Sequence, residues 1–525
     1  MTRKMDLAQA LGMAFAHWEA GRLPQARKLA RDLEKLRPDL PGLSYLQGLL
    51  ALAEGQGRKA AQHLTKALAQ SPDAPPLLLA MARAQAQQHR RDDAIAYYQR
   101  LLAVAPTTLD AQAELAELHL AAHDWAAALP LLAAAVASRP DWAAGHNNLG
   151  VAQREQSQWA EAALSFARAA DLDPTLVKAS VNLAAVLRRL KRPADALAAA
   201  KGAITAAIDS LAPPSADLAD AWIESGLALR DQHDTAAALS AFQSAQTALP
   251  PDAPKSLSAR IHWLQGESLR ALGREQDAIT AYRHAVADDP ADLHGAGLIL
   301  AQLGDAAAPA QAPQAYVRKL FDQYADGFDH DLVEVLGYRA PQLLAGTVLA
   351  HLGDGPFDML DLGCGTGLMG QALAGRCGRL AGVDLSPRMV EKTLARRHDG
   401  KPLYTQAEAA DLLAVLNRES AAWDVVAAAD VFVYLGDLNA VFAAAVSALR
   451  SGGALVFSTE QADGDGTKGD GFTLHDTSRY GHSAAYLRAL ADRHGLVVTV
   501  LEENWTRREK GEPVPGYVAL FRKPA

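Results

Sequence analysis

The chain has 525 residues, more than the ~250 to 300 that one hydrophobic core organises, so two or more domains are expected. Apolar residues make up 50% and charged residues 21% of the chain, which is the balance of a folded soluble protein and excludes a disordered one. With 51 basic against 60 acidic side chains and a formal net charge of −9, the chain lacks the basic excess of nucleic-acid-binding proteins, so nucleic acid is disfavoured as a partner.

Cysteine content and hydropathy limit the cellular compartments in which the protein is expected. The two cysteines, Cys364 and Cys377, are too few for a disulfide scaffold or a metal cluster, so we expect no metal and a reducing, cytoplasmic location. No signal-peptide core follows the basic N-terminus, and the longest apolar run, Leu131 to Ala137, is far shorter than the ~20 residues that span a bilayer. No membrane association is therefore expected.

The first three-fifths of the chain repeat with a fixed period. Small residues stand twelve and twenty-four positions before each proline of the series, where two helices would cross closely, and a bulky residue often stands eight before it. Proline closes the second helix of each unit because it lacks a donor N–H and clashes with the preceding turn. Successive members of the proline series differ by 34 positions: Pro38, Pro72, Pro106, Pro140 and Pro174.

This period and its small-residue pattern resemble the tetratricopeptide repeat. After a degenerate copy over Val177 to Ser210 and a short insertion, further repeats end at Pro250 and Pro290, which predicts an all-α solenoid over residues 1–305 with about eight repeats and a capping helix near Leu293 to Leu303. Such arrays are binding surfaces. We therefore expect a protein or peptide partner in the groove of the array, with self-association as the other option.

A short linker and an α/β domain are predicted to follow. Residues 306–315 have no hydrophobic periodicity and contain two prolines, so they read as a linker to a domain over 316–525. Short apolar runs then alternate with helical stretches, which predicts a parallel sheet covered on both faces. The strands are expected at Phe357 to Asp361, Leu380 to Asp384, Trp423 to Ala429 and Ala454 to Thr459, and the helices at Leu368 to Ala374, Pro387 to Arg397, Asp411 to Arg418 and Leu438 to Leu449.

The end of the chain differs from this alternation. Leu496 to Glu502 and Val514 to Phe521 are expected to form an antiparallel pair. A parallel sheet that ends in such a hairpin resembles the Rossmann-like fold of class I methyltransferases.

A glycine-rich turn follows the first expected strand. Gly363, Gly365 and Gly367 let the backbone turn sharply and approach a ligand, and the helix that follows offers free N–H groups to a carboxylate. Asp384 ends the second strand, where a carboxylate can accept hydrogen bonds from both hydroxyls of a ribose. Met389, just beyond it, is expected to pack on an adenine face.

The segments Asp-Leu-Gly-Cys-Gly-Thr-Gly from Asp361 and Gly-Val-Asp-Leu-Ser around Asp384 are similar to the motifs of S-adenosylmethionine-dependent methyltransferases. The resemblance implies that Asp361 and the glycine turn hold the methionine end of S-adenosylmethionine, Asp384 the ribose and Asp411 the adenine amino group. Asp430, after the fourth strand, falls at the edge where open parallel sheets bind ligands and joins the expected cofactor site. The sequence there departs from the motif of amino-methylating DNA enzymes, which argues against DNA bases as acceptors.

A nicotinamide-dependent oxidoreductase is the rival interpretation, because Gly365 to Gly370 also spells the dinucleotide motif G-x-G-x-x-G. A dinucleotide is bound by a fold with two mononucleotide-binding halves. The sequence shows only one glycine turn, which disfavours a dinucleotide. We therefore favour the methyltransferase.

The segment 316–350 precedes the sheet and resembles the lid helix that covers the cofactor in related methyltransferases. Tyr324 and Phe328 stand four residues apart, on one face of a continuous helix. The resemblance places Tyr324 against the cofactor and Phe328 near the substrate. The alternative is that both rings belong only to the core.

A further group of polar and aromatic residues follows the fifth strand and ends near Arg507. Arg479, Tyr480 and His482 are catalytic candidates, with His482 as a base and Arg479 or Arg507 as a clamp for an anion. Tyr434 and Arg507 are expected to contact the substrate. The alternative is that His482 caps a helix and the arginines are solvated. The Asp- and Gly-rich stretch 463–471 is predicted to be a mobile loop.

The sequence predicts an enzyme that transfers the methyl group of S-adenosylmethionine to a small molecule, anionic in view of Arg479 and Arg507, or to a protein recruited with help of the array. The combined features resemble predicted bacterial methyltransferases fused to tetratricopeptide repeats. The alternative from another class is a scaffold that binds the cofactor without turnover.

Overall fold

In the computed structural model the chain divides into two compact units, Met1–Pro251 and Asp252–Ala525. The structure describes residues 6–211, 213–325, 327–330, 337–462, 471–509 and 511–525. Most of the predicted loop 463–471 therefore lies outside the described residues. The predicted domain boundaries at 305 and 316 stay predictions, since the compact units divide the chain earlier.

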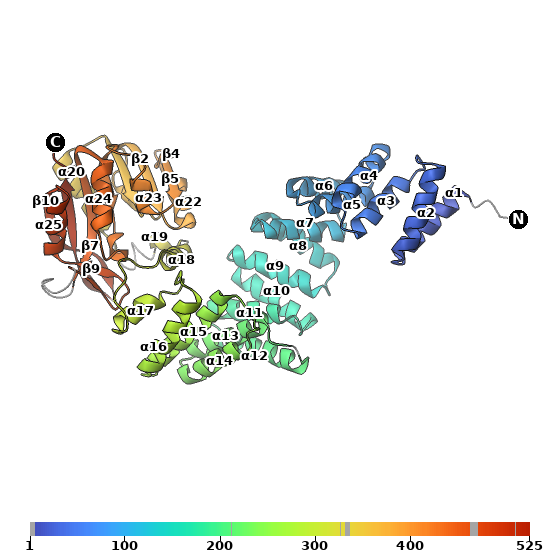
Figure 1. The fold of residues 1–525 in the computed structure, drawn as a ribbon, viewed down its shortest axis with the longest axis horizontal. Coiled ribbons are helices and arrows are strands. Elements are labelled where there is room, and N and C mark those ends of the chain that lie inside the picture. Colours follow the sequence, from blue (N-terminus) through green and yellow to red (C-terminus); the bar gives the residue numbers. More distant parts are fainter. Residues whose placement is uncertain (1–5, 212, 326, 331–336, 463–470, 510) are drawn as a thin grey trace. The chain divides into compact units, whose positions relative to one another are not determined.

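The first unit consists of helices that follow one another in antiparallel pairs (Figure 1). Each pair corresponds to one repeat, and the tetratricopeptide fold predicted from the 34-residue period is confirmed. The helices are α1 (Leu7–Glu19), α2 (Leu23–Leu36), α3 (Leu43–Ala53), α4 (Gly57–Gln70), α5 (Pro75–Gln87), α6 (Arg91–Val104), α7 (Leu109–Ala121), α8 (Trp125–Ser138), α9 (Ala143–Glu155), α10 (Trp159–Leu172), α11 (Val177–Arg189), α12 (Pro193–Asp209), α13 (Ala216–Asp231) and α14 (Thr235–Thr247).

The two helices of a repeat pack through one small and one bulky residue sixteen positions apart. A Cβ placed on Gly150 would lie 2.7 Å from the Phe166 ring, and one on Gly226 would lie 2.4 Å from the Phe242 ring. Phe166 and Phe242 are fully buried. Glycine at this point is therefore a packing requirement, because a larger residue would drive the paired helices apart.

The second unit begins with another helical pair, α15 (Lys255–Ala271) and α16 (Glu275–Asp288), and the short helix α17 (Ala296–Gln302) at the position of the predicted capping helix. Asp292 fixes the start of α17, since its carboxylate accepts from Ala296 N at 2.7 Å and from Gly297 N at 2.8 Å. The helices α18 (Gln314–Tyr324), α19 (Phe328–His330) and α20 (Ala340–Leu352) lead to the sheet.

The sheet has the strand order β10-β11-β7-β6-β1-β2-β5. Along this order, neighbouring strands run parallel except where β11 pairs with β10 and with β7, so the predicted parallel sheet with a terminal antiparallel hairpin is confirmed. Beside this order, β8 and β9 form a further antiparallel pair. The strands are β1 (Phe357–Leu362), β2 (Cys377–Asp384), β5 (Gln406–Ala409), β6 (Trp423–Ala428), β7 (Leu449–Gln461), β10 (Val497–Glu509) and β11 (Glu512–Arg522), with β8 (Phe472–Leu474) and β9 (Tyr480–His482) beside β7 and a separate small ribbon of β3 (Arg397–His398) and β4 (Lys401–Pro402).

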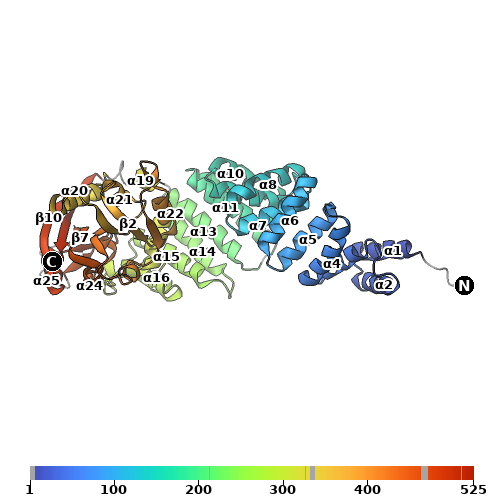
Figure 2. The ribbon, with the colours of Figure 1, turned by 90° about the horizontal axis from the view of Figure 1, so that it is seen from above.

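Alternate residues of each strand enter the two cores on opposite faces of the sheet. Met359 packs in the core that also holds residues of α20 and α21 (Leu368–Ala372), whereas Leu360 packs in the core on the other face. Figure 2 shows α20 and α21 on one side of the strands and α24 on the other. The remaining helices are α22 (Pro387–Ala395), α23 (Leu412–Leu416), α24 (Asn439–Ala448) and α25 (Ala484–Arg493).

The segment predicted as a linker is built into the second unit. Ala312 N donates to Tyr434 O at 2.8 Å, Gly436 N donates to Ala310 O at 2.8 Å, and the hydroxyl of Tyr480 donates to Pro309 O at 2.7 Å. The two prolines and the lack of hydrophobic periodicity predicted a linker. The sequence carried no sign of these contacts, because hydrogen bonds between backbone groups do not depend on the side-chain pattern. The segment is an ordered edge of the sheet domain.

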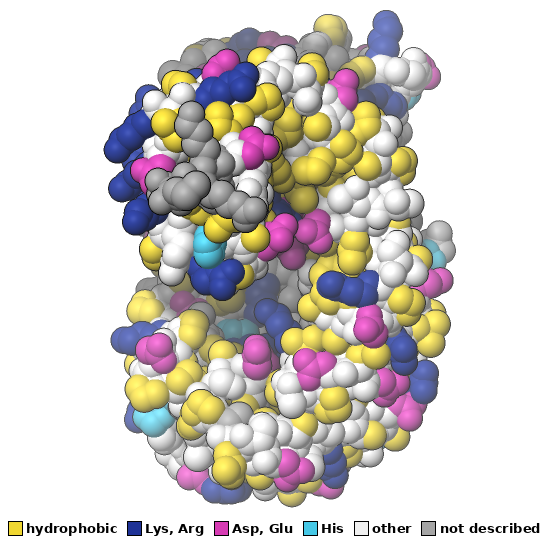
Figure 3. Space-filling view, turned by 90° about the vertical axis from the view of Figure 1, so that its right-hand side faces the viewer, with side chains coloured by type: hydrophobic (Ala, Val, Ile, Leu, Met, Phe, Trp, Pro, Cys, Tyr) yellow, Lys and Arg dark blue, Asp and Glu magenta, His cyan; other side chains and the backbone are white. Residues whose placement is uncertain are grey.

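Charges of both signs are interspersed with apolar side chains on the face of the molecule in Figure 3.

Among the described residues, no helix combines the length and the apolar character needed to cross a bilayer.

Candidate functional site

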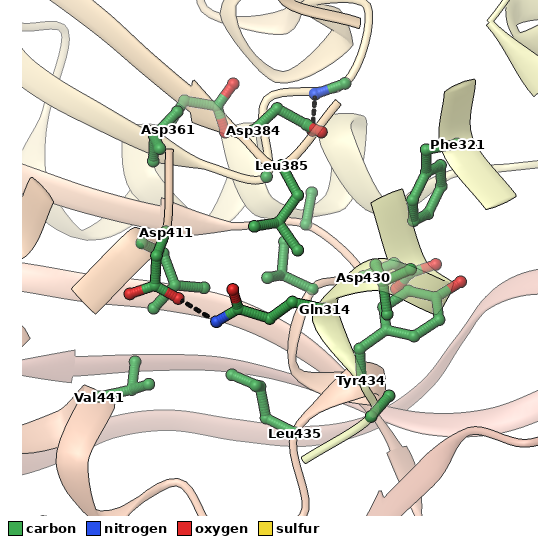
Figure 4. Close-up of a pocket in the computed structure, with 18 of the residues that line it drawn as sticks. Gln314, Phe321, Asp361, Asp384, Leu385, Asp411, Asp430, Tyr434, Leu435 and Val441 are labelled. Atoms are coloured by element: carbon green, nitrogen blue, oxygen red, sulfur yellow. Dashed lines mark hydrogen bonds between the residues drawn. The ribbon is translucent and has the colours of Figure 1, made fainter. Parts of the chain in front are cut away.

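A cavity of about 300 Å³ lies at the carboxyl ends of the parallel strands of the second unit. Asp361 at the end of β1, Asp384 at the end of β2, Asp411 after β5 and Asp430 after β6 all line it (Figure 4). The carboxyl ends of parallel strands meet at one edge of a sheet, which is why these residues, distant in sequence, converge. Four predicted acidic residues are therefore brought to one site.

The glycine turn forms one wall of this cavity. Gly363, Gly365 and Gly367 have φ values of 60°, 52° and 90°, in the left-handed region that favours glycine. A Cβ on Gly363 would lie 2.5 Å from Val431 Cγ2, whereas one on Gly365 would meet only the Phe328 ring, at 3.6 Å. A side chain at position 363 would therefore clash with Val431, whereas position 365 has space on the cavity side of the turn.

Asp361 is a buried carboxyl group with one open oxygen. Its side chain is 1% exposed, and Oδ2 accepts from the Tyr404 hydroxyl at 2.5 Å. Oδ1 has no hydrogen-bond partner among the described residues. Burial raises the pKa of Asp361 to about 7. A buried acceptor without a donor is costly, so this oxygen fits a cationic or hydrogen-bond-donating group of a ligand.

Asp384 joins the second strand to the glycine turn. Its Oδ2 accepts from Gly365 N at 2.9 Å, and its Oδ1 accepts from Ser386 N at 2.8 Å. Burial raises the pKa of Asp384, while the backbone N–H groups oppose that rise. Each carboxylate oxygen retains a second lone pair, so the side chain can hold the turn and still accept from two hydroxyl groups.

Asp411 stands at the mouth of the cavity with its two oxygens in different roles. Oδ1 accepts from Ala414 N at 3.1 Å and caps α23, whereas Oδ2 accepts from Gln314 Nε2 at 2.7 Å (Figure 4). Gln314 belongs to the N-terminal end of α18, and sequence reasoning did not single it out.

Asp430 is the acidic group on the other side of the cavity. Its backbone has φ 55°, which is unusual for a residue with a side chain. Oδ1 accepts from Ser458 Oγ at 2.6 Å, and Oδ2 accepts from Thr506 Oγ1 at 3.3 Å. Burial raises the pKa of Asp430. Two hydroxyl donors therefore hold the carboxyl group in place at the cavity wall.

Arg479 and Arg507 also line the cavity, but a carboxylate already pairs with both. Arg507 Nη2 lies 2.6 Å from Glu460 Oε1, and Arg479 Nη1 lies 3.4 Å from the same oxygen. The Arg479 guanidinium lies 5.8 Å from the centroid of the Tyr434 ring. A second carboxylate, Glu509, lies 3.0 Å from Arg507 Nη1. The predicted anion clamp is thus a cluster of paired charges in which Glu460, which the sequence interpretation missed, is the shared acceptor.

Three aromatic side chains, from α18, α19 and the segment after β6, pack together at the cavity wall. The Phe321 ring lies 6.0 Å from Phe328 and 5.6 Å from Tyr434, edge to face in both cases. Phe328 and Tyr434, both predicted to contact the substrate, line the cavity. Asp322 and Asp329 anchor the segment, accepting from Ser386 Oγ at 2.6 Å and from Arg396 Nη2 at 2.5 Å.

Tyr324 differs from its predicted place. Helix α18 ends at Tyr324 and α19 begins at Phe328, so the two rings do not share one continuous helical face. The side chain of Tyr324 is 52% exposed and is not part of the cavity lining. The four-residue spacing gave no signal of the break between the two helices, and Phe321 takes the place within the aromatic cluster.

His482 and Tyr480, two of the three catalytic candidates, are not part of the cavity lining. His482 is fully buried, with Nδ1 2.6 Å from Thr459 Oγ1 and Nε2 3.1 Å from Gly436 O. Burial lowers the pKa of His482 to about 4. Both residues lie in β9, which pairs with β7 and β8. The Tyr480 hydroxyl donates to Pro309 O, so Tyr480 joins this part of the sheet to the segment before α18.

Gly367 and Met389 are two further predicted cofactor residues outside the cavity lining. Met389 is fully buried, and a Cβ on Gly367 would meet Tyr404 and Arg396. Tyr404, which the sequence interpretation missed, donates to Asp361 and accepts from Gly370 N at 3.0 Å. Tyr404 belongs to no recognisable motif. It lies just before β5, and the pairing of β5 with β2 places it beside the turn.

Comparison with known families agrees with this geometry. The sequence profile described as a methyltransferase domain matches residues 360–455, and two profiles described as tetratricopeptide repeat match residues 51–107 and residues 11–75, 113–177 and 223–292. The chain joins tetratricopeptide repeats to a methyltransferase domain. The methyltransferase profile begins within β1 and includes the glycine turn, Asp384, Asp411 and Asp430.

The methyltransferase domain also has curated relatives. A ubiquinone biosynthesis O-methyltransferase of Idiomarina loihiensis is 35% identical over 104 residues, which are 19% of this chain and 41% of the relative. Nodulation protein S of Rhizobium tropici is 32% identical over 119 residues, 22% of this chain and 48% of the relative. The chain thus spans less than half the length of these curated relatives.

Comparison with solved structures gives matches with low TM-scores. MamA of Desulfovibrio magneticus is 22% identical, covers 33% of this chain and 97% of its own, and has a TM-score of 0.31. A tetratricopeptide repeat protein of Parabacteroides merdae is 15% identical, covers 50% of this chain and 98% of its own, and has a TM-score of 0.33.

Proposed function

We propose that the methyltransferase domain transfers the methyl group of S-adenosylmethionine. The observation that carries the proposal is one cavity that combines the open Oδ1 of buried Asp361, the glycine turn, Asp384 and Asp411. Asp361 would hold the ammonium group of the cofactor, Asp384 both ribose hydroxyls and Asp411 the amino group of adenine. When bound, S-adenosylmethionine supplies an electrophilic methyl group on its sulfonium sulfur.

The other side of the cavity would receive the acceptor. Phe321, Phe328 and Tyr434 would exclude water and orient it, since positioning and desolvation supply most of the rate of such a displacement. Asp430 takes over the role of base that the sequence assigned to His482, because its carboxylate lines the cavity and its pKa is raised by burial. The acceptor would be a small molecule or a protein residue; the O-methyltransferase relatives favour an oxygen nucleophile.

Methyl transfer can be tested without knowledge of the acceptor. We would incubate the purified full chain with fractionated cell extract and S-adenosylmethionine labelled in its methyl group. The proposal predicts label in one class of small molecule or protein, and none with an Asp384→Ala variant. Cofactor binding without transfer to any fraction would instead support a scaffold.

The raised pKa of Asp361 predicts a pH-dependent affinity for S-adenosylhomocysteine. Below pH 7 the empty site holds a neutral carboxyl group, whereas the ammonium group of the ligand favours the carboxylate. Binding must then release a proton, so the affinity should rise by up to about tenfold per pH unit between pH 5.5 and 7 and level off above. Calorimetry across this range measures the slope.

An Asp361→Asn variant is the control for this slope, because its amide does not titrate. The variant should bind more weakly above pH 7, and its affinity should stay flat over the same range. An equal slope in the two proteins would show that another group takes up the proton.

The first unit carries a separate groove of about 960 Å³. Its walls include Trp18, Tyr45 and Leu79, and Glu117 and Glu114 line the same space. Glu114 is held by Arg83 Nε at 2.9 Å and by the Tyr98 hydroxyl at 2.5 Å. We propose that this groove binds a segment of a protein partner, as its apolar walls and the interaction role of such repeats support.

A photo-crosslinking side chain at position 79 is expected to capture that partner in cells. Leu79 lines the groove, so a reactive group there would contact the bound segment. The matched control is position 164, because Leu164 lies on the same unit with a side chain 73% exposed and is not part of the groove lining. Identical products from both positions would contradict the proposal, and mass spectrometry of the crosslinked bands distinguishes the results.

A further inference from the structure

The backbone of residues 310–312, just before α18, positions the side chain of Gln314 at the mouth of the cavity. Ala310 O accepts from Gly436 N at 2.8 Å and from Asp437 N at 2.9 Å, and Gln311 forms a β-bridge with Leu435. Pro313 then precedes the first turn of α18, in which Gln314 lies. A backbone fixed on both sides of the bridge presents Gln314 to the cavity in a defined position, as catalytic and binding groups require.

The amide of Gln314 has hydrogen-bonding capacity to spare. One N–H of Nε2 donates to Asp411 Oδ2 at 2.7 Å, which leaves the second N–H and both lone pairs of Oε1. In the part of the chain that the structure describes, no residue donates to Oε1. Because Asp411 Oδ1 caps α23, Oδ2 is the oxygen that a ligand would share with Gln314.

A donor and an acceptor side by side complement the edge of adenine that carries N6 and N7. Glutamine is the side chain that pairs with N6 and N7 of adenine in nucleic acids, because its amide matches a donor amine next to an acceptor ring nitrogen. The apolar side chains of Leu385 and Leu435 lie on either side of the Gln314–Asp411 pair, where a flat base would need contact (Figure 4).

We propose that Gln314 reads the adenine base of the cofactor together with Asp411. The N6 amine would donate to Asp411 Oδ2, and the second N–H of Gln314 would donate to N7. The inference rests on the proposed function and deepens it. It also gives Gln314, which the sequence places in the predicted linker 306–315, a direct part in recognition of the cofactor.

The test is a set of calorimetric titrations of the full chain with S-adenosylhomocysteine and with its 7-deaza analogue, which lacks the acceptor at N7. The wild-type protein should bind the analogue about tenfold more weakly, the loss that a hydrogen bond of this kind supports. A Gln314→Ala variant should bind S-adenosylhomocysteine about tenfold more weakly than the wild type and should no longer distinguish the two ligands. Gln323→Ala, an exposed glutamine on the same helix, is the control and should behave as the wild type.

Two results would overturn the inference. Wild-type affinity and selectivity in Gln314→Ala would show that the amide takes no part, and tighter binding by that variant would show that Gln314 competes with the base for Asp411. Failure of the proposed function is a distinct result, because the wild-type protein would then not bind S-adenosylhomocysteine at all.

Discussion

Replacement of Asp384 by alanine is expected to weaken the binding of S-adenosylhomocysteine by 100-fold or more. The carboxylate would accept from both ribose hydroxyls, and hydrogen bonds to a charged group contribute about 1.5 to 3 kcal/mol each. Asp384 also accepts from Gly365 N and Ser386 N, so the variant leaves two backbone donors beside the glycine turn without a partner. Calorimetry with the ligand in excess measures the loss.

An Asp399→Ala variant is the control for this substitution. The Asp399 side chain is 87% exposed and is not part of the cavity lining, so ligand affinity should not change. An Asp384→Asn variant retains one acceptor oxygen and should fall between the wild type and Asp384→Ala. Unchanged affinity in Asp384→Ala would contradict the proposed contact between Asp384 and the ribose.

Replacement of Phe242 by alanine is expected to destabilise the pair α13–α14 by about 3 to 5 kcal/mol. The ring is fully buried against Gly226, and its loss would leave a cavity between the two helices of the repeat. Because unfolding of a chain with two units is not a single transition, the measurement should be local. Hydrogen exchange of peptides from α13 and α14 reports this pair alone, and its protection should fall.

The paired glycine supplies a sharper test of the same contact. Gly226→Leu alone should overpack the pair and cost about 1 to 3 kcal/mol. Together with Phe242→Ala, the leucine would fill the cavity, so the double variant should be more stable than the sum of the two effects predicts. Leu164→Ala, on an exposed side chain, is the control. Strictly additive effects would contradict direct packing of these two residues.

Local signals in the sequence were sufficient to predict the repeats and several of the residues that line the candidate site. The 34-residue spacing predicted helix pairs because each repeat packs chiefly within itself and on its neighbours. The glycine turn and Asp384 were predictable because a strand, a turn and a helix follow one another within a few residues. Asp361 and Asp411 were identified by the resemblance to methyltransferase motifs, and Asp430 by the rule that ligands bind at the edge where parallel strands end.

What the sequence could not provide depends on contacts between distant segments. Pairing of β9 with β7 carries His482 into the sheet and away from the cavity, and no local pattern contains that register. The pairing of Gln311 with Leu435 brings Gln314 to the site although the segment before it looks like a linker. Tyr404 and Glu460 likewise act through partners far away in the sequence.

The central claim is that the cavity beside Asp361 and Asp384 binds S-adenosylmethionine or its product. Calorimetric titration of the purified full chain with S-adenosylhomocysteine, and with NAD as the control, tests it most directly. We expect saturable binding of S-adenosylhomocysteine with one site per chain and no heat of binding with NAD. Saturable binding of NAD alone would contradict it and point to oxidoreduction.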